Sequence, residues 1–517
     1  MVKIFGFLLV AVFIIQEIIS INNESLTFDE PDHLTSGFTA VKFRNFRSDY
    51  MHPVLIKELA VIPTLNYPSS RSYIEANPTL FWPRMMVVTL SAVLAIVLFY
   101  FVKSLTGGMT AIIALWLFVF EPNILAHSHY VTTDMGGAIF YFFTHIFLWR
   151  YLEKKTIKNL LNFAVLLGIA LSTRHSNLIF LSISLLILFI IKLIEDKFRV
   201  RLKISLGRVI LFLATVFFTI WSAYLFDIRS LRQDQYANTT IPNIFIEKNN
   251  NSIWWDIPIP APGYLTSLME TVRYNQSGGV SYLFGQIKGN GWWFYFPVAF
   301  FLKTPIPLII SFMAGLYFYR DRKWRKRLLI PIAAVFFVGI FSKMNIGLRY
   351  ILPVYPFVIV FSALFLGQLI RTKKGIVLVI FLLIWQALST LKSTPYYLTY
   401  FNEIVLDPTK KQELLLDSNL DWGQGLIALR KYTDKISLDL YLSYWGSVDP
   451  KLYKIDYRGL PTHVPTCRPV IDAELADLSG IIAVSMNNWQ LCGYKNIKRL
   501  KDKWPPEIIG GSIFVFR

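Results

Sequence analysis

Charged residues are scarce in this chain. Of its 517 residues, 16% are Asp, Glu, Lys or Arg, whereas 54% are hydrophobic. Soluble domains carry about 25% charged residues, so the composition excludes an ordinary soluble fold. Acidic residues are the scarcer sign, with 33 Asp and Glu against 52 Lys and Arg and a formal net charge of +19. The sequence therefore indicates a membrane protein whose excess of basic residues needs an explanation.

Apolar stretches near the ~20 residues that span a bilayer recur along the first three quarters of the chain. Several are short or interrupted. The first resembles a signal peptide in length, but no convincing small-residue cleavage site follows it, so we interpret it as a retained helix. The pattern predicts about eleven transmembrane helices, at residues 2–20, 82–102, 109–126, 135–150, 159–173, 176–194, 207–226, 293–318, 328–342, 350–370 and 375–392.

Basic residues are unevenly distributed among the connecting loops. If the N-terminus lies inside, the basic loops all face inside; they are 103–108, 150–158, 192–208, 319–327 and 371–374. The short outer loops carry only Arg174, Lys343 and Arg349. This asymmetry is typical of the positive-inside rule. The run RDRKWRKR (320–327) is then a cytoplasmic anchor, and no nucleic-acid partner is needed to explain the net charge.

This topology leaves three long segments outside, at 21–81, 227–292 and 393–517. Residues 1–392 are expected to form the membrane module, with the first two segments as its outer loops. The tail, 393–517, shows a helical stretch at 421–433 and strand-like alternation in ISLDLYLSY (436–444), GIIAVS (480–485) and SIFVFR (512–517). We expect it to form a small α/β domain on the outer face, in a multi-pass protein of the plasma or inner membrane.

Cysteine is nearly absent. The only two, Cys467 and Cys492, lie in the tail. An oxidising exterior would let them pair as a disulfide, and two cysteines buried separately are the alternative.

Ionisable residues gather in the outer loops. FDEPDHL (28–34) follows the first apolar stretch closely, DYMHPVLIKEL (49–59) comes later in the same loop, and EPNILAHSHYVTTD (121–134) forms the next outer turn. Cationic residues come from later segments, namely Arg174, Lys303 and Arg349. A charge at the bilayer centre costs roughly 2.5–3.5 kcal/mol, so such groups usually face a polar cavity or a partner. Snorkelling to the interface is the alternative for Arg174 and Arg349.

These charges complement one another. Cations would hold an anionic phosphate at the membrane surface, Arg through paired donors and Lys as a point charge. A carboxylate would act on a polar head group as general base or metal ligand. A polyprenyl-phosphate-linked sugar has this anatomy, with its long tail in the lipid bilayer.

The order of the motifs resembles the dolichyl-phosphate-mannose protein mannosyltransferase superfamily, which includes the bacterial aminoarabinose transferase of lipid A. The resemblance starts at the acidic pair DE (29–30), followed by HP (52–53) and a Lys. It extends through AHSHYVTTD (126–134), YLFGQIKGNGWWFYFPVAFFLKTP (282–305), GLRYILPVYPF (347–357) and YYLTYFNEIVLDPTKKQELLLDSNLDWGQGL (396–426). Val54 follows Pro53 where many relatives have a second proline. The resemblance is to a prokaryotic branch with a C-terminal outer domain and implies the C-type glycosyltransferase fold.

The resemblance also implies an inverting hexosyl or pentosyl transfer from a polyprenyl-phosphate sugar to a protein, lipid or glycan. Asp29 would be the catalytic base, and Glu30 would shape the pocket or bind a metal. Arg349, Lys303 and Arg174 would bind the donor phosphate. The remaining pocket residues would be His33, His52, His127, Asp134 and Tyr350.

A divalent metal is left open. Glu30 and His33 are the candidate ligands, but no compact spacing such as HExxH occurs. In the tail, LLLDSNLDWGQGL (414–426) presents Asp417, Asn419 and Asp421. We expect them to contact the acceptor or the outer domain, and helix capping is a compatible alternative. The Gly and closing Glu of an EF-hand are missing.

Two other classes of protein stay open. A transporter would place charges nearer mid-bilayer and is often built from repeats, none of which is evident at a fixed period. A non-catalytic glycan-binding or assembly protein could keep the fold without turnover. Clustering of ionisable residues at one face favours surface chemistry.

Overall fold

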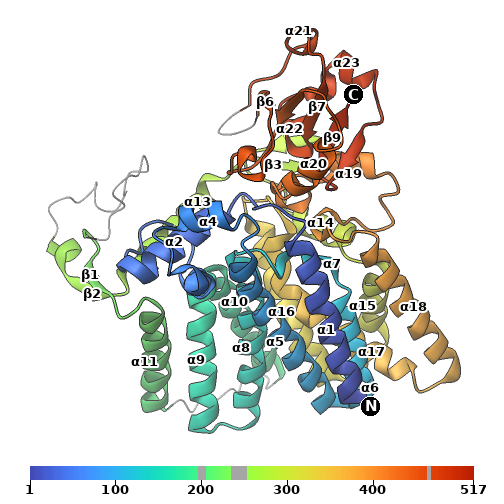
Figure 1. The fold of residues 1–517 in the computed structure, drawn as a ribbon. Coiled ribbons are helices and arrows are strands. Elements are labelled where there is room, and N and C mark those ends of the chain that lie inside the picture. Colours follow the sequence, from blue (N-terminus) through green and yellow to red (C-terminus); the bar gives the residue numbers. More distant parts are fainter. Residues whose placement is uncertain (50, 196–204, 234–252, 463–466) are drawn as a thin grey trace.

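The computed structural model describes residues 1–49, 51–195, 205–233, 253–462 and 467–517. A bundle of long helices forms its lower part, and a sheet-containing domain stands at one end of the bundle (Figure 1). The predicted outer loop 227–292 is described except for 234–252, which lie outside the described residues.

Every predicted apolar stretch coincides with helix. The bundle contains α1 (Val2–Ile21), α5 (Phe81–Thr106), α6 (Gly108–Val119), α8 (Thr133–Glu153), α9 (Ile157–Thr173), α10 (Ser176–Glu195), α11 (Leu206–Ala223), α14 (Tyr295–Lys303), α15 (Ile306–Phe318), α16 (Arg322–Phe341), α17 (Tyr355–Leu369) and α18 (Lys373–Leu391). Among the described residues, six helices are long and apolar enough to cross a membrane, and α14 with α15, bent by 119°, makes a seventh candidate. A helical membrane protein is confirmed, and the count of eleven spans stays a prediction.

Burial distinguishes the centre of the bundle from its edge. In the most apolar 18-residue part of Leu348–Leu369, which ends in α17, 89% of the residues are buried, whereas in α11 11% are. The exposed side chains of α11 are large and apolar, for example Leu213 and Phe218. Such a surface is unfavourable in water and suits a lipid environment.

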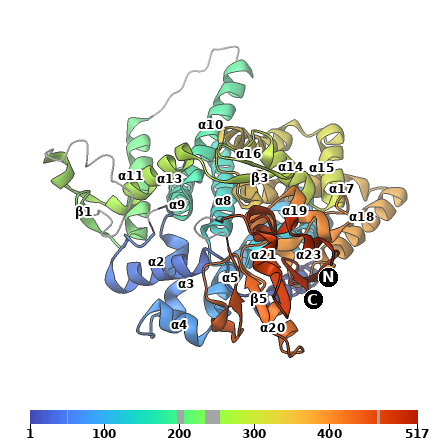
Figure 2. The same cartoon turned by 90° about the horizontal axis from the view of Figure 1, so that it is seen from above.

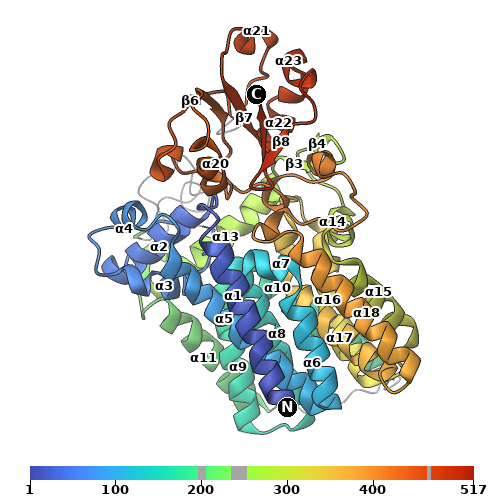
Figure 3. The same cartoon turned by 45° about the vertical axis from the view of Figure 1, so that its right-hand side comes forward.

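The basic loops meet at the end of the bundle away from the sheet domain. Glu153 pairs with Lys323 and Arg327 at 2.7 Å, and Lys326 pairs with Glu195. The N-terminus lies at the same end (Figure 3). The described parts of the predicted inner loops 150–158, 192–208 and 319–327 therefore share one end of the molecule.

The first predicted outer loop is largely helical. It forms α2 (Glu30–Phe43), α3 (Leu55–Val61), η1 (Ile62–Thr64) and α4 (Ser70–Ala76). The second contributes β1 (Ile228–Ser230), η2 (Ile253–Asp256), β2 (Pro258–Pro260), α13 (Pro262–Ser277), β3 (Ser281–Leu283) and β4 (Gln286–Lys288). Seen from above, α2, α3, α4 and α13 lie beside the sheet domain, whereas β1 lies at the edge of the molecule (Figure 2).

The tail folds around a five-stranded mixed sheet in the order β6-β5-β7-β9-β8. Its strands are β5 (Leu440–Ser443), β6 (Arg458–Gly459), β7 (Ile481–Ser485), β8 (Glu507–Ile509) and β9 (Ile513–Phe516). β5 and β7 are parallel, with Leu440 opposite Ile481, and β9 runs antiparallel to β7. The three predicted strands are confirmed as β5, β7 and β9.

Short helices and one disulfide complete this outer domain. The helices are α20 (Leu426–Thr433), α21 (Asp472–Leu475), α22 (Met486–Leu491) and α23 (Lys498–Lys501). Cys467 and Cys492 are bonded, with their Cα atoms 5.2 Å apart. The predicted pairing is confirmed. The connection from α18 runs through η4 (Tyr397–Thr399), η5 (Pro408–Lys410), α19 (Lys411–Leu414) and η6 (Asp417–Asn419).

Candidate functional site

A cavity of about 480 Å³, here called the outer cavity, lies between the bundle and the outer domain. Its walls come from segments far apart in sequence: the start of α2, residues 48–49 and 51–53, the α9–α10 turn, α13, η3 (Leu348–Val354), the loop around η6, and Trp445 of the outer domain. The predicted residues that line it are Asp29, His33, His52, Arg174, Arg349, Tyr350 and Asp417.

Asp29 stands at the entrance to α2. It is the N-cap residue, but its carboxylate makes no cap hydrogen bond, and a proline occupies the first turn of the helix. Oδ2 instead accepts a hydrogen bond of 2.7 Å from Nη1 of Arg349. The Asp29 side chain is 25% exposed, so this carboxylate remains accessible from the cavity.

Two arginines and two aspartates form a charge-balanced group. Arg349 Nη1 lies 2.7 Å from Asp29 and 3.6 Å from Asp134. Arg174 Nη1 donates to Asp134 Oδ1 at 2.5 Å and to the Arg349 carbonyl at 3.3 Å. Asp134 is 3% exposed and lies below the cavity wall, where it holds both guanidinium groups in place. The two arginines predicted to bind phosphate are therefore side by side.

Aromatic rings fix the orientation of these arginines. The Arg349 guanidinium lies 4.3 Å from the centre of the Trp422 ring, and Arg174 lies 5.1 Å from that of Tyr350. Such cation–π contacts leave the edge of the guanidinium plane free to donate. Arg349 Nε is buried and has no hydrogen-bond partner among the described residues. This cluster therefore has an unused donor.

Glu30 points away from the outer cavity. It is 0% exposed, and Arg84 donates to it twice, from Nε at 2.9 Å and from Nη2 at 2.6 Å. The backbone amides of Thr27 and Val131 donate to the same carboxylate. Burial raises the pKa of Glu30, but the charge and hydrogen bonds of Arg84 and these amides outweigh it and leave the pKa below its usual value. Both oxygens are occupied, so the geometry favours a structural role for Glu30 over catalysis or metal binding.

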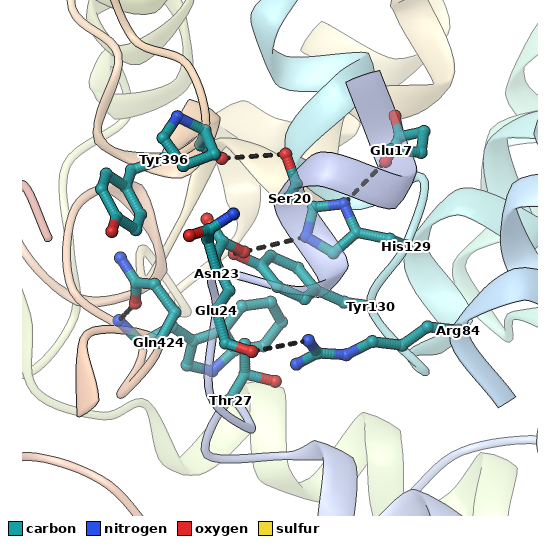
Figure 4. A network of polar contacts seen from close by, with 12 residues as sticks. Glu17, Ser20, Asn23, Glu24, Thr27, Arg84, His129, Tyr130, Tyr396 and Gln424 are labelled. Carbon is teal, nitrogen blue, oxygen red and sulfur yellow. Dashed lines mark hydrogen bonds and ion pairs between the residues drawn. The ribbon is translucent and has the colours of Figure 1, made fainter. Parts of the chain in front are cut away.

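A second buried network ties the end of α1 to the chain that carries Asp29 (Figure 4). His129 bridges two carboxylates, Glu17 at 2.7 Å and Glu24 at 2.9 Å. Tyr130 also donates to Glu24, at 2.6 Å, and Arg84 donates to the Glu24 carbonyl at 2.9 Å. All these side chains are fully buried. The network anchors residues 22–29, which end at Asp29.

His33 and His52 share a carboxylate that the sequence analysis did not single out. Asp49 Oδ2 lies 3.1 Å from His52 Nδ1 and 3.9 Å from His33 Nε2. These three residues offer ligand atoms within 4.8 Å of one another, the one such metal-type group among the described residues. Burial lowers the pKa of His33 to about 4, which keeps its imidazole neutral. However, Lys57 Nζ lies 3.0 Å from the same Asp49 oxygen, so a cation already balances this acid.

Two predicted residues lie elsewhere. Lys303 is 2% exposed and donates to the carbonyls of Leu398 (2.6 Å) and Asn419. It therefore links the end of α14 to the connection between α18 and the outer domain. Neither Lys303 nor His127 lines the outer cavity. His127 is buried against Trp422, with ring centres 6.1 Å apart. Burial lowers the pKa of His127 to about 3.

The three predicted residues of the tail have different surroundings. Asp417 faces the cavity, and burial raises its pKa to about 6. Asn419 accepts from the backbone amide of Leu348 at 2.9 Å and donates to Tyr295 at 2.8 Å, which positions the segment that carries Arg349. Asp421 accepts from Gly423 at 3.2 Å beneath the outer domain. Only Asp417 is placed to meet a substrate.

The sequence analysis missed several residues of this region. They are Asp49, Lys57, Arg84, Trp422 and Trp445, and the first two lie inside the quoted segment DYMHPVLIKEL. Arg84 carried a signal of its own, since it is the one charged residue in the apolar helix α5 before Lys103. Trp422 and Trp445 carried no signal, because one Trp among 14 is not distinctive.

Comparison with known proteins adds family information. Residues 77–221 match the family model described as dolichyl-phosphate-mannose-protein mannosyltransferase. No curated protein sequence matches the chain. The structure of ArnT from Cupriavidus metallidurans bound to undecaprenyl phosphate is similar, with a TM-score of 0.50 and 12% identity over 99% of this chain and 97% of that chain. The oligosaccharyltransferase of Archaeoglobus fulgidus gives a TM-score of 0.45 and 13% identity, over 74% of this chain and 56% of that chain.

At 12% identity the likeness to ArnT shows a shared fold along nearly the whole chain. The family match covers the second to seventh predicted spans, including EPNILAHSHYVTTD and Arg174. Together they agree with the resemblance seen in the sequence: residues 77–221 of this membrane protein match the dolichyl-phosphate-mannose-protein mannosyltransferase family model, and the chain has an ArnT-like fold.

Proposed function

We propose that this protein transfers a sugar from a polyprenyl-phosphate donor to an acceptor hydroxyl in the outer cavity, with inversion at the anomeric carbon. The observation that carries the proposal is the contact between Asp29 and Arg349 in the cavity wall. One face thus presents a carboxylate able to take a proton and two arginines able to hold a phosphate. The structure of ArnT bound to undecaprenyl phosphate supports a donor of this class.

The reaction would be a single displacement. Asp29 takes the proton of the acceptor hydroxyl while the hydroxyl oxygen attacks the anomeric carbon. The bond from that carbon to the phosphate oxygen breaks, and its electron pair leaves with the lipid phosphate. Arg349 and Arg174 stabilise the charge that grows on the phosphate. Asp134 holds both arginines, and Glu30 acts by fixing the start of α2 rather than by touching substrate.

The proposed topology places this chemistry on the extracytoplasmic side, with residues 1–392 as the membrane module and 393–517 as the outer domain. The basic loops at the opposite end support this orientation. We assign no step to a metal, because Lys57 already neutralises Asp49 and Glu30 is engaged by Arg84.

The test compares wild type with Asp29→Asn in nanodiscs containing a panel of polyprenyl-phosphate sugars. Mass spectrometry follows loss of the donor and formation of glycosylated product in added membrane extract. Asp32→Asn is the matched control, because Asp32 lines the same cavity less than one helical turn from Asp29. We expect Asp29→Asn to lower turnover about 10³-fold or more, since general base catalysis contributes 10²–10⁴. Asp32→Asn should keep most of the activity.

The other outcomes are informative. Equal losses in both variants would show that the cavity needs negative charge rather than a base at Asp29. Full turnover in Asp29→Asn would remove Asp29 from the mechanism. Donor binding without consumption in wild type would favour a glycan-binding or assembly protein.

A further inference from the structure

A second and larger cavity, of about 740 Å³, opens where the outer domain meets the helical part. Its walls come from the β3–β4 hairpin, α19 and the outer domain near α22 and α23. We call it the aromatic cleft and define it by Tyr282, Gln412, Trp489, Lys495, Lys501 and Trp504. None of the residues proposed for sugar transfer lines it.

Two stacked tryptophans form one wall of the aromatic cleft. The rings of Trp489 and Trp504 lie 5.5 Å apart at 29°, and Trp489 stacks in turn on Phe516 of β9 at 5.4 Å. Trp489 is 4% exposed, whereas Trp504 is 39% exposed. The sheet therefore holds a rigid aromatic surface whose outer ring remains open. Such a ring offers a flat apolar face with negative charge density.

Polar groups surround this aromatic wall. Gln412 is 1% exposed, and its Oε1 has no hydrogen-bond partner among the described residues. Buried carbonyl oxygens rarely stay unpaired, because losing water without a new donor is costly. Lys495 donates to Gln490 at 2.9 Å, and Lys501 and Glu413 are exposed in the same lining. The cleft thus combines an apolar platform with donors, and with an acceptor that lacks a partner.

The aromatic cleft and the outer cavity are neighbours, with a small cavity between them. A small cavity of about 80 Å³ shares Tyr282 with the cleft, and it shares Asp417 and Trp445 with the outer cavity. The hairpin is fixed to α19, since the Phe284 amide donates to the Leu414 carbonyl at 3.1 Å. In Figure 3 β3 and β4 lie beside α22 and β8. The small cavity therefore lies between the aromatic cleft and the outer cavity.

We propose that the aromatic cleft binds a saccharide portion of the acceptor. A sugar ring has an apolar C–H face that packs on tryptophan and hydroxyls at its edge that bond to amide and ammonium groups, so it matches both features of the cleft. The proposal rests on the proposed function and specifies it, because it assigns the acceptor to glycans or glycolipids.

The test measures saccharide binding to the full-length protein in nanodiscs, by saturation-transfer NMR and tryptophan fluorescence. The probes are chitotetraose, mannotetraose, cellotetraose and tetragalacturonic acid, with Ser/Thr-rich peptides as the competing class. We expect at least one tetrasaccharide to bind and Trp504→Ala to weaken it about tenfold. Gln412→Leu removes the unpaired oxygen at nearly constant volume and should also weaken binding. Trp254→Ala is the matched control, since Trp254 is 73% exposed and belongs to η2, just before β2 in the chain. The strand β2 lies away from the outer domain (Figure 1).

Failure of this inference is distinguishable from failure of the proposed function, because binding is measured without turnover. No tetrasaccharide bound, binding unchanged in both cleft variants, or a peptide bound in the cleft instead would each overturn the inference. Asp29→Asn should keep saccharide binding while it loses donor consumption. If the wild-type protein binds a saccharide but consumes no donor, the inference about the aromatic cleft stands and the proposed transferase function is wrong.

Discussion

Replacing Glu30 by Gln should strongly destabilise the protein, because this buried carboxylate has no spare oxygen. Its Oε2 accepts from Arg84 and from the amide and hydroxyl of Thr27, and its Oε1 accepts from Arg84 and the amide of Val131. A glutamine side chain keeps one acceptor oxygen, and its NH₂ group replaces the other oxygen, where it faces donors with which it cannot form a hydrogen bond. The guanidinium of Arg84, which is 0% exposed, loses its counter-charge at the same time.

The magnitude follows from that loss. Removing one partner of a buried ion pair leaves a charge unpaired and typically costs about 3–5 kcal/mol. At least two donors also face an NH₂ group in place of a carboxylate oxygen, each worth about 1–3 kcal/mol when left unsatisfied. These contributions overlap, so we expect about 3–5 kcal/mol in total.

Unfolding is followed by denaturant titration in detergent, with tryptophan fluorescence as the signal. Glu58→Gln is the matched control: Glu58 is 7% exposed, and burial raises its pKa to about 8, so it is protonated at pH 7 and resembles Gln. This control should cost less than ~1 kcal/mol. A cycle with Arg84→Gln should show strong coupling to Glu30→Gln. If Glu30→Gln is no less stable than Glu58→Gln, the ion pair is not what fixes the start of α2.

Three further predictions concern other parts of the structure. Asp134→Asn should tighten the binding of undecaprenyl phosphate, because Arg174 and Arg349 lose their shared counter-charge. It should also lower turnover at least ~10-fold, because the two arginines are no longer held in position. Weaker binding in a lipid-phosphate titration would contradict this prediction. Replacing Cys467 and Cys492 together by Ser should lower the free energy of unfolding of the outer domain by about 3 kcal/mol, because the unfolded chain gains loop entropy. Hydrogen exchange should become faster in β7, while the helices of the bundle stay protected. Burial lowers the pKa of His129, but its bonds to Glu17 and Glu24 outweigh this and raise it to about 9. The charged His129 therefore stabilises the fold fully below pH ~6.5, and this stabilisation is lost as the pH rises through ~9. When the unfolding midpoint is measured against pH, His129→Gln should flatten the curve in this range.

Periodicity predicted the elements of the fold well. The long apolar stretches and the alternation of 480–485 and 512–517 reflect burial within one element, which a sequence shows directly. The α14–α15 break was harder, because apolar residues resume directly after Lys303, Thr304 and Pro305, so 293–318 reads as one stretch. Lys303 ends α14 at that break, where the backbone turns and a buried ammonium can donate to carbonyls of the outer segment. This lysine deep in an apolar stretch thus has backbone carbonyls as partners and does not line the outer cavity.

The cavity was only partly predictable. The DE pair begins a helix, and successive helical residues point about 100° apart, so Asp29 and Glu30 point in different directions, and only Asp29 lines the outer cavity. Which of the two faces it depends on Arg84 and Arg349, far away in the chain. The role of Asp49 likewise depends on contacts with His52 and Lys57 that spacing alone does not reveal. Residue types predict the chemistry, whereas the pairing of charges required the tertiary structure.

The charge balance of the outer cavity makes donor binding depend on pH. Arg174 and Arg349 are already matched by Asp29 and Asp134, so a donor phosphate adds a negative charge near Asp417. Burial raises the pKa of Asp417 to about 6, although the Arg349 charge partly opposes the shift, and an incoming phosphate would raise this pKa further. Binding therefore takes up a proton, and donor affinity should increase roughly tenfold as pH falls from 7 to 5. The probe is a polyprenyl-phosphate sugar, whose phosphodiester keeps one charge over this range. Asp417→Asn should bind it with an affinity that is high and independent of pH, and a variant that retains the wild-type slope would assign the proton to another group.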